Sequence, residues 1–86
     1  MRHVLHLIKD PANRIALDVV VQQARDPDVR LSIVLLQRAA DLRDRLPGEV
    51  FRLDEGSGNG TPAHYPPITH SQLLDLIFAA DTVVTW

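Results

Sequence analysis

Two short and almost continuously apolar runs place the strongest constraint on how this 86-residue chain folds. They cover residues 4–8 (VLHLI) and 31–36 (LSIVLL), and polar residues follow each of them. Strands that are apolar on both faces are typical of parallel sheets, because helices cover such sheets on both sides. A third run at 49–54 alternates more, so we expect it to lie less deep, and residues 82–86 form a last strand.

The segments between these runs predict three helices. Residues 11–25 form the first, with Asp10 as its N-cap and Pro11 as its first residue. Its polar side chains share a narrow sector, and its apolar arc is wider than packing on one sheet requires. This width indicates a further contact, with a neighbouring helix or with a second chain. Residues 37–46 predict a short second helix with a narrow apolar stripe.

The third helix begins after Thr69 and ends before Asp81. Thr69 and Gln72 have the spacing of a capping box, and Ile68 can pack onto Leu73 as a hydrophobic staple. The resulting order βαβαβαβ predicts one α/β domain over residues 1–86, with a four-stranded parallel sheet flanked by helices. Ligands of such doubly wound sheets bind beyond the carboxyl ends of the strands.

The longest connection covers residues 55–67 and holds three of the four glycines together with three prolines. Its glycine-rich part at 56–60 follows a strand, as phosphate-binding loops do. However, no Lys-Ser/Thr pair follows, and the prolines delay the next helix. We therefore expect a flexible loop, ordered by a partner if at all, and no nucleotide site.

Composition argues against several classes of function. Nine basic and eleven acidic residues give a formal net charge of −2, which does not suit binding to a nucleic-acid backbone. The absence of cysteine removes disulfides, thiolate metal sites and cysteine nucleophiles. No apolar run is long enough to span a membrane, and the start lacks the apolar segment of a signal peptide. We expect a cytoplasmic protein.

Histidines provide the best candidates for a polar site. His6 lies within an apolar strand, where a hydrogen-bonded core histidine is the favoured interpretation, and His3 lies on the opposite face of that strand. His70 occupies the first turn of the last helix, at the strand ends where a ligand would bind. The predicted ligand-binding residues are Lys9, Asp10, His64, Tyr65 and His70.

Neither a metal site nor an enzyme is predicted from these residues. No paired-ligand spacing suggests zinc, no serine has the surroundings of a nucleophile, and no cofactor is expected. An acid–base or metal-dependent enzyme that uses His64 and His70 is the least favoured alternative. A partly buried histidine that covers the apolar face of the last helix is the simpler interpretation of His70.

Interface residues are expected on the first helix and the last strand. Trp86 buries a large area either in the core of its own chain or in an interface, and the sequence leaves both open. The predicted interface residues are Val20, Val21 and Trp86.

Both ends of the chain resemble the DsrE/DsrF/DsrH-like family of sulfur-relay proteins, and most closely its DsrH/TusB branch. Residues 4–11 (VLHLIKDP) are similar to the family's opening strand and Lys-Ser-Pro turn. Residues 68–76 (ITHSQLLDL) and 83–86 (VVTW) resemble its last helix and its terminal strand with a final tryptophan. The resemblance implies a small flavodoxin-like fold and a cytoplasmic homo- or hetero-oligomer. Such assemblies pass persulfide sulfur during tRNA thiouridine formation or sulfur oxidation.

Departures from the family pattern limit what this chain can do. Val20 stands where DsrH has a cysteine, and residues 37–40 (QRAA) replace an acidic-glycine segment. We therefore expect a non-catalytic subunit or scaffold of a sulfur-relay-like assembly, which contacts copies of itself or cysteine-bearing DsrE-like homologues. The alternative is a stand-alone small-molecule binding module, with a crevice at the carboxyl ends of the strands.

Overall fold

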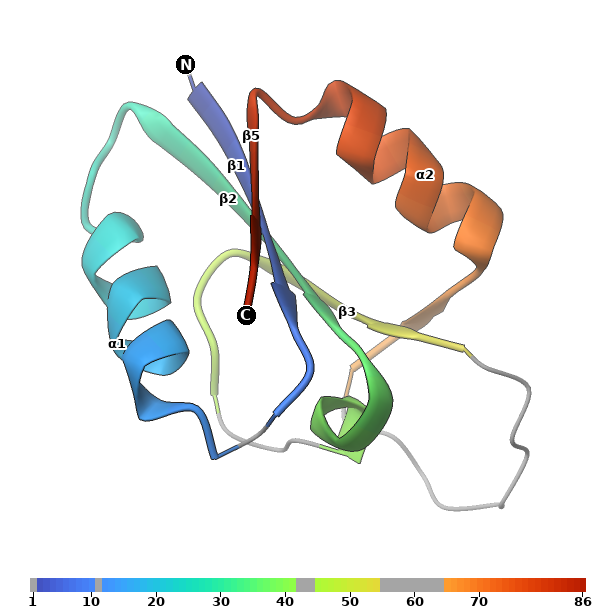
Figure 1. The fold of residues 1–86 in the computed structure, drawn as a ribbon. Coiled ribbons are helices and arrows are strands. Elements are labelled where there is room, and N and C mark those ends of the chain that lie inside the picture. Colours follow the sequence, from blue (N-terminus) through green and yellow to red (C-terminus); the bar gives the residue numbers. More distant parts are fainter. Residues whose placement is uncertain (1, 11, 42–44, 55–64) are drawn as a thin grey trace.

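A parallel sheet runs through the centre of the computed structural model (Figure 1). The structure describes residues 2–10, 12–41, 45–54 and 65–86. Within this part of the chain the sheet has five strands in the order β4-β3-β2-β1-β5, and every neighbouring pair is parallel. The strands are β1 (Arg2–Ile8), β2 (Val29–Leu35), β3 (Glu49–Leu53), β4 (Pro67–Ile68) and β5 (Thr82–Thr85).

The prediction of an α/β domain with a parallel sheet is confirmed, and the predicted count of four strands is wrong. The additional strand is β4, whose two residues pair with Arg52 and Leu53 of β3. It begins at Pro67, the last residue of the segment 55–67 that is predicted as a flexible loop, and most of that segment is outside the described residues. A strand of two residues that begins with proline has no alternation by which a sequence could reveal it.

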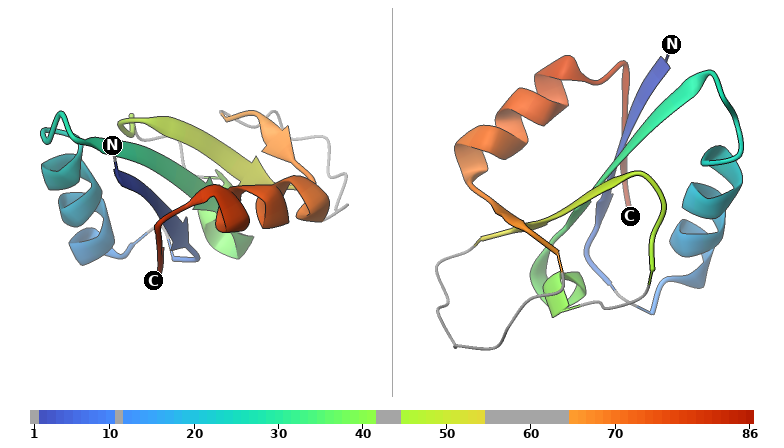
Figure 2. Two further views of the ribbon diagram at one scale, coloured as in Figure 1. Left: turned by 90° about the horizontal axis from the view of Figure 1, so that it is seen from above. Right: turned by 180° about the vertical axis from the view of Figure 1, so that it is seen from behind.

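Two helices cover opposite faces of the sheet, as Figure 2 shows. Helix α1 (Arg14–Gln23) packs over one face, where Ala16 and Val20 join the buried residues of β2. Helix α2 (His70–Ala79) lies on the other face, against Leu5 and Val34. The structure is therefore doubly wound in its described part, as predicted from the order of the elements.

The first part of the predicted second helix at 37–46 is η1 (Gln37–Asp41), a stretch of 3-10 helix, and residues 42–44 of that prediction lie outside the described residues. Gln37 enters it with a φ of 51°, the left-handed conformation that non-glycine residues adopt infrequently. The Ala39 N–H then lies 3.0 Å from the Leu36 carbonyl and 3.3 Å from that of Lys9. The chain is thus drawn against the end of β1, and Ala39 is fully buried.

Helix α1 begins at Arg14, three residues after the start predicted with Asp10 as the N-cap. Its N-cap is Asn13, whose side chain accepts a hydrogen bond of 3.1 Å from the Ala16 N–H. The Asp10 carboxylate instead accepts from the Ala12 N–H at 2.9 Å, so it closes a turn before the helix. Pro11 lies outside the described residues.

The predicted start of α2 is confirmed. The Thr69 hydroxyl accepts from the Gln72 N–H at 3.1 Å, and the Gln72 side-chain oxygen accepts from the Thr69 N–H at 2.8 Å. This reciprocal pair is the capping box that the sequence predicts. Ile68 and Leu73 belong to one apolar cluster, as the predicted staple requires.

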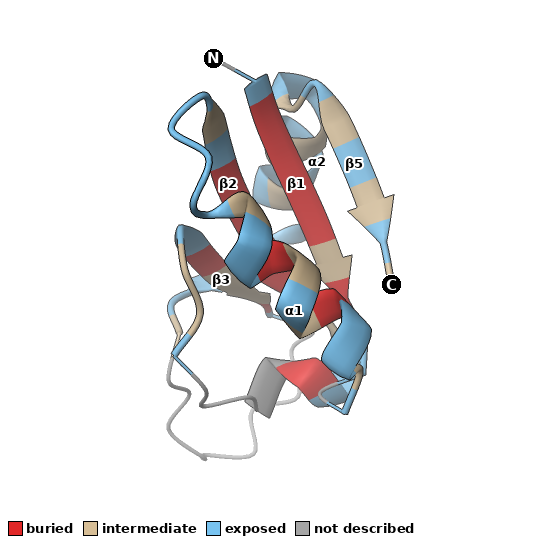
Figure 3. Ribbon diagram, turned by 90° about the vertical axis from the view of Figure 1, so that its left-hand side faces the viewer, coloured by how far each residue is buried: buried red, intermediate tan, exposed pale blue. Residues whose placement is uncertain are grey.

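The core is deepest along β1 and β2, which are buried on both faces (Figure 3). Ile8, Ile33 and Leu35 pack beneath α1, whereas Leu5 and Val34 pack beneath α2. Strand β3 is buried at only two of its positions, Val50 and Leu53, in agreement with its predicted shallower place. None of the helices in the described residues has the length and apolar character that a membrane crossing requires.

Candidate functional site

A partly buried hydrogen-bonded network joins β1, α1 and Trp86. His6 is fully buried, and its Nε2 lies 2.6 Å from the Gln23 side-chain oxygen. The Trp86 indole N–H donates to His6 Nδ1 at 2.9 Å. The two rings are stacked, with centroids 6.0 Å apart and planes 15° from parallel. Trp86 packs against the cluster beneath α1, so it contributes to the core of its own chain.

The geometry fixes the protonation state of His6. An indole nitrogen can only donate, so Nδ1 must carry a lone pair and the proton resides on Nε2. Nε2 then donates to the Gln23 oxygen, so both ring nitrogens of His6 and the Trp86 N–H have partners. Burial lowers the pKa of His6 from its ordinary value of 6.5, and the hydrogen bond to Gln23 partly offsets this. His6 is a structural core histidine, as the favoured interpretation held.

The second histidine of β1 lies on the other face. His3 is buried, and its Nε2 lies 2.8 Å from the Ser32 hydroxyl. The two imidazoles therefore cannot bind one ligand. Among the described residues, no group of three or more His, Cys, Asp or Glu side chains is placed to hold a metal ion.

The structure does not gather the predicted ligand-binding residues into one cluster. Lys9 and Asp10 are exposed after β1, and His70 is exposed after β4. Both positions are at the carboxyl edge of the sheet, but β1 and β4 are three strand spacings apart, or about 14 Å. The Tyr65 hydroxyl accepts from the Leu46 N–H at 3.0 Å, and its ring packs on the core. His64 lies outside the described residues.

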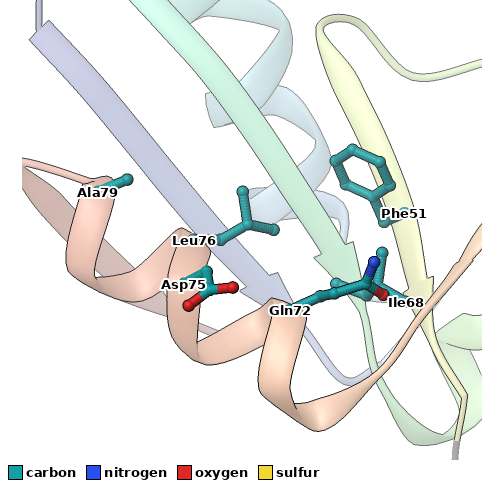
Figure 4. A pocket seen from close by; sticks show the side chains of 6 residues that line it. All are labelled: Phe51, Ile68, Gln72, Asp75, Leu76 and Ala79. Carbon is teal, nitrogen blue, oxygen red and sulfur yellow. The ribbon is translucent and has the colours of Figure 1, made fainter.

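An open groove lies instead between α2 and the β3–β4 edge of the sheet (Figure 4). Its volume is about 370 Å³, and its walls are mainly apolar. The polar groups on its helical side are the Gln72 amide and the Asp75 carboxylate. Sequence reasoning missed this groove because β4 forms one wall of it. The lining residues are Phe51, Ile68, Gln72, Asp75, Leu76 and Ala79.

Helix α2 also carries two large apolar side chains that face solvent. Leu74 is 53% exposed and Phe78 is 84% exposed, and their spacing of four residues places them side by side. No residue of α2 is fully buried. Val83 on β5 is exposed to 39%. We call Leu74, Phe78 and Val83 the apolar ridge. In the sequence, this ridge could be recognised from Leu74 and Phe78, two apolar residues four positions apart that lie outside the core-facing side of the helix.

The predicted interface residues of α1 have different environments. Val20 is fully buried and packs on the sheet, so it is a core residue, which corrects the interface role expected for it. Val21 is 42% exposed, and Ile15 on the same helix is 69% exposed. The wide apolar arc therefore leaves side chains in solvent in the single chain.

Comparisons with known proteins identify a fold and no family. No protein-family model and no curated protein matches the chain. The crystal structure of the YchN protein from E. coli is similar, with a TM-score of 0.68 and 20% sequence identity over 100% of both chains. This similarity shows the α/β fold, which is compatible with a small flavodoxin-like domain.

Proposed function

We propose that this chain is a non-catalytic subunit or scaffold of a sulfur-relay-like assembly in the cytoplasm, and that it acts through protein contacts. The observation that carries the proposal is the exposure of Phe78 and Leu74 on a helix without a buried residue. Single exposed apolar residues are ordinary, but adjacent large ones mark interaction surfaces. Covering them with a partner removes apolar area from water.

The chemistry of the chain restricts the role within such an assembly. Because the chain has no cysteine, a persulfide must be held by another subunit. Within the described residues, the strongly buried titratable side chains, His3 and His6, are used in hydrogen bonds to other side chains of the chain. These features favour positioning of a cysteine-bearing DsrE-like partner over chemistry performed by the chain itself.

A quantitative pull-down of the tagged chain from its native cells tests this proposal. We expect cysteine-bearing DsrE-like proteins to co-elute at a fixed stoichiometry. The double variant Leu74→Ser/Phe78→Ser should lose them, because it removes the apolar ridge on α2. Ile15→Ser is the matched control, since Ile15 is exposed but lies on α1, on the other face. Recovery of no such protein, or recovery that the double variant leaves unchanged, contradicts the proposal.

A second candidate function, a small-molecule binding module, is favoured by the groove beside α2. Its volume of about 370 Å³ lies within the range of ligand pockets, and its mixture of apolar walls with few polar groups is typical of them. A fragment screen by NMR tests this candidate. Binding should shift the signals of Phe51 and Asp75, and Ala79→Trp should block it by filling the groove. A screen without hits at these residues argues against a ligand site.

A further inference from the structure

The two edges of the sheet differ in how they are protected. Strand β4 has only two residues and begins with a proline, and both features hinder pairing with another strand. Strand β5 has four residues, Thr-Val-Val-Thr, all of them β-branched. It contains no proline and no charged residue. An edge strand of this kind is a template for a further strand.

The hydrogen bonds of β5 show which backbone groups are available. The Trp86 N–H donates to the Leu7 carbonyl at 2.9 Å. In a parallel ladder alternate residues point toward the neighbouring strand, so the N–H and C=O of Val84 also face β1. Those of Val83 and Thr85 therefore point away from the sheet. Figure 3 shows β5 at the margin of the sheet, with no helix or strand of the described residues beyond it.

We propose that β5 is a self-association surface, on which β5 of a second copy pairs in the antiparallel direction. This inference rests on the proposed function, since it names the partner of one contact surface. The two-fold axis passes beside Val84, so that Val83 of one copy exchanges hydrogen bonds with Thr85 of the other. Every outward backbone group of these residues then has a partner, and the uncharged strand presents no like charges to itself.

The position of α2 fits the same arrangement. Val83 is in register with Leu5, whose side chain packs beneath α2, so Val83 is on the α2 face. A two-fold axis perpendicular to the sheet keeps both α2 helices on one side. Leu74 and Phe78 project from the flank of α2 that is turned away from the groove and hence from β3 and β4. The apolar ridge therefore borders the junction, where the second copy lies beside Val83 and leaves Leu74 and Phe78 to the partner of the proposed function.

Sedimentation equilibrium of the purified chain, combined with amide exchange by NMR, tests the inference. We expect a monomer–dimer equilibrium, and slower exchange at Val83 and Thr85 as dimer forms. The Val84 amide is the internal control, because it is bonded to β1 in both states. Thr85→Pro removes an outward N–H and no bond to β1. It should weaken the dimer about thirtyfold, since two symmetry-related hydrogen bonds are lost.

Two further variants keep the outcome decisive. Val83→Lys places like charges near the junction and should also favour monomer, whereas Ile15→Ser should leave the dimer intact. A circular dichroism melt confirms that each variant is folded. A chain that stays monomeric at high micromolar concentration overturns the inference. So does a dimer that tolerates Thr85→Pro and Val83→Lys, or one in which the Val83 and Thr85 amides gain no protection.

The same experiments separate this inference from the proposed function. A monomeric chain that still recovers cysteine-bearing partners, and loses them in Leu74→Ser/Phe78→Ser, refutes self-pairing and leaves the subunit role standing. A β5-dependent dimer that recovers no such partner supports self-pairing and refutes the subunit role.

Discussion

The replacement of Trp86 by phenylalanine tests how far the buried network stabilises the fold. Phe keeps one aromatic ring but removes the second ring of the indole and with it the N–H that donates to His6 Nδ1. The fully buried His6 is then left with an acceptor that has no partner. Leaving a buried polar group unsatisfied costs about 1–3 kcal/mol. We therefore expect Trp86→Phe to lower the free energy of unfolding by about 2 kcal/mol near neutral pH.

The pH dependence of the free energy of unfolding distinguishes the loss of the Trp86–His6 hydrogen bond from a simple loss of buried ring area. Burial holds the pKa of His6 below 6.5 in the folded chain, so the unfolded chain binds more protons as the pH falls through that value. Stability is therefore fully present above about pH 6.5 and declines below it, by at most about 1.4 kcal/mol per pH unit. The decline ends once folded His6 is protonated. Protonation of His6 makes Nδ1 a donor, so the parent chain then also loses the hydrogen bond from the Trp86 N–H, as the variant does.

The cost of Trp86→Phe should therefore shrink as the pH falls. Urea unfolding of both proteins at about pH 7.5 and at the acidic pH where the decline in parent stability has ended measures this cost. When His6 is replaced by leucine in both proteins, the cost of Trp86→Phe should no longer depend on pH. An equal cost at both pH values in the parent background refutes a hydrogen bond to neutral His6.

Two predictions concern local backbone structure. Thr69→Ala removes the side-chain cap of α2, and we expect chemical denaturation to show a loss of about 1 kcal/mol, with Ser71→Ala as a control elsewhere in the first turn. Gly48→Ala should cost about 2 kcal/mol in the same assay. Gly48 has a φ of 80°, and a Cβ there would lie 2.6 Å from the Leu31 carbonyl oxygen. A neutral effect at either position contradicts the described geometry.

The sequence predicts those parts of the fold that depend on local patterns. The runs around Leu5 and Ile33 are apolar on both faces because helices cover both sides, and this alone indicates a parallel sheet. The capping box at Thr69 and Gln72 is likewise a local signal, since both partners lie within one turn. The interpretation of His6 as a core residue followed from its apolar neighbours on the strand.

Features that depend on tertiary contacts could not be predicted in this way. Strand β4 exists because Ile68 pairs with Leu53, which no pattern of two residues reveals. The 3-10 helix replaces an α-helix because the Ala39 N–H bonds to the distant Lys9 carbonyl. The candidate ligand site failed to assemble for a similar reason. Strand β4, which precedes His70, lies three positions from β1 in the sheet, and Lys9 follows β1, although both residues remain at one edge of the sheet.

The pairing of β5 with β1 has a consequence for how the chain folds as it is synthesised. Trp86 and His6 are 80 residues apart, yet they bond to each other across the β1–β5 side of the sheet. Until residues 82–86 leave the ribosome, β1 has one unpaired edge and His6 has an unsatisfied nitrogen. Contacts this distant in sequence form slowly, because the entropy of closing the chain is lost first. The nascent chain therefore exposes one edge of a buried strand to chaperones and to other nascent chains until residues 82–86 have emerged.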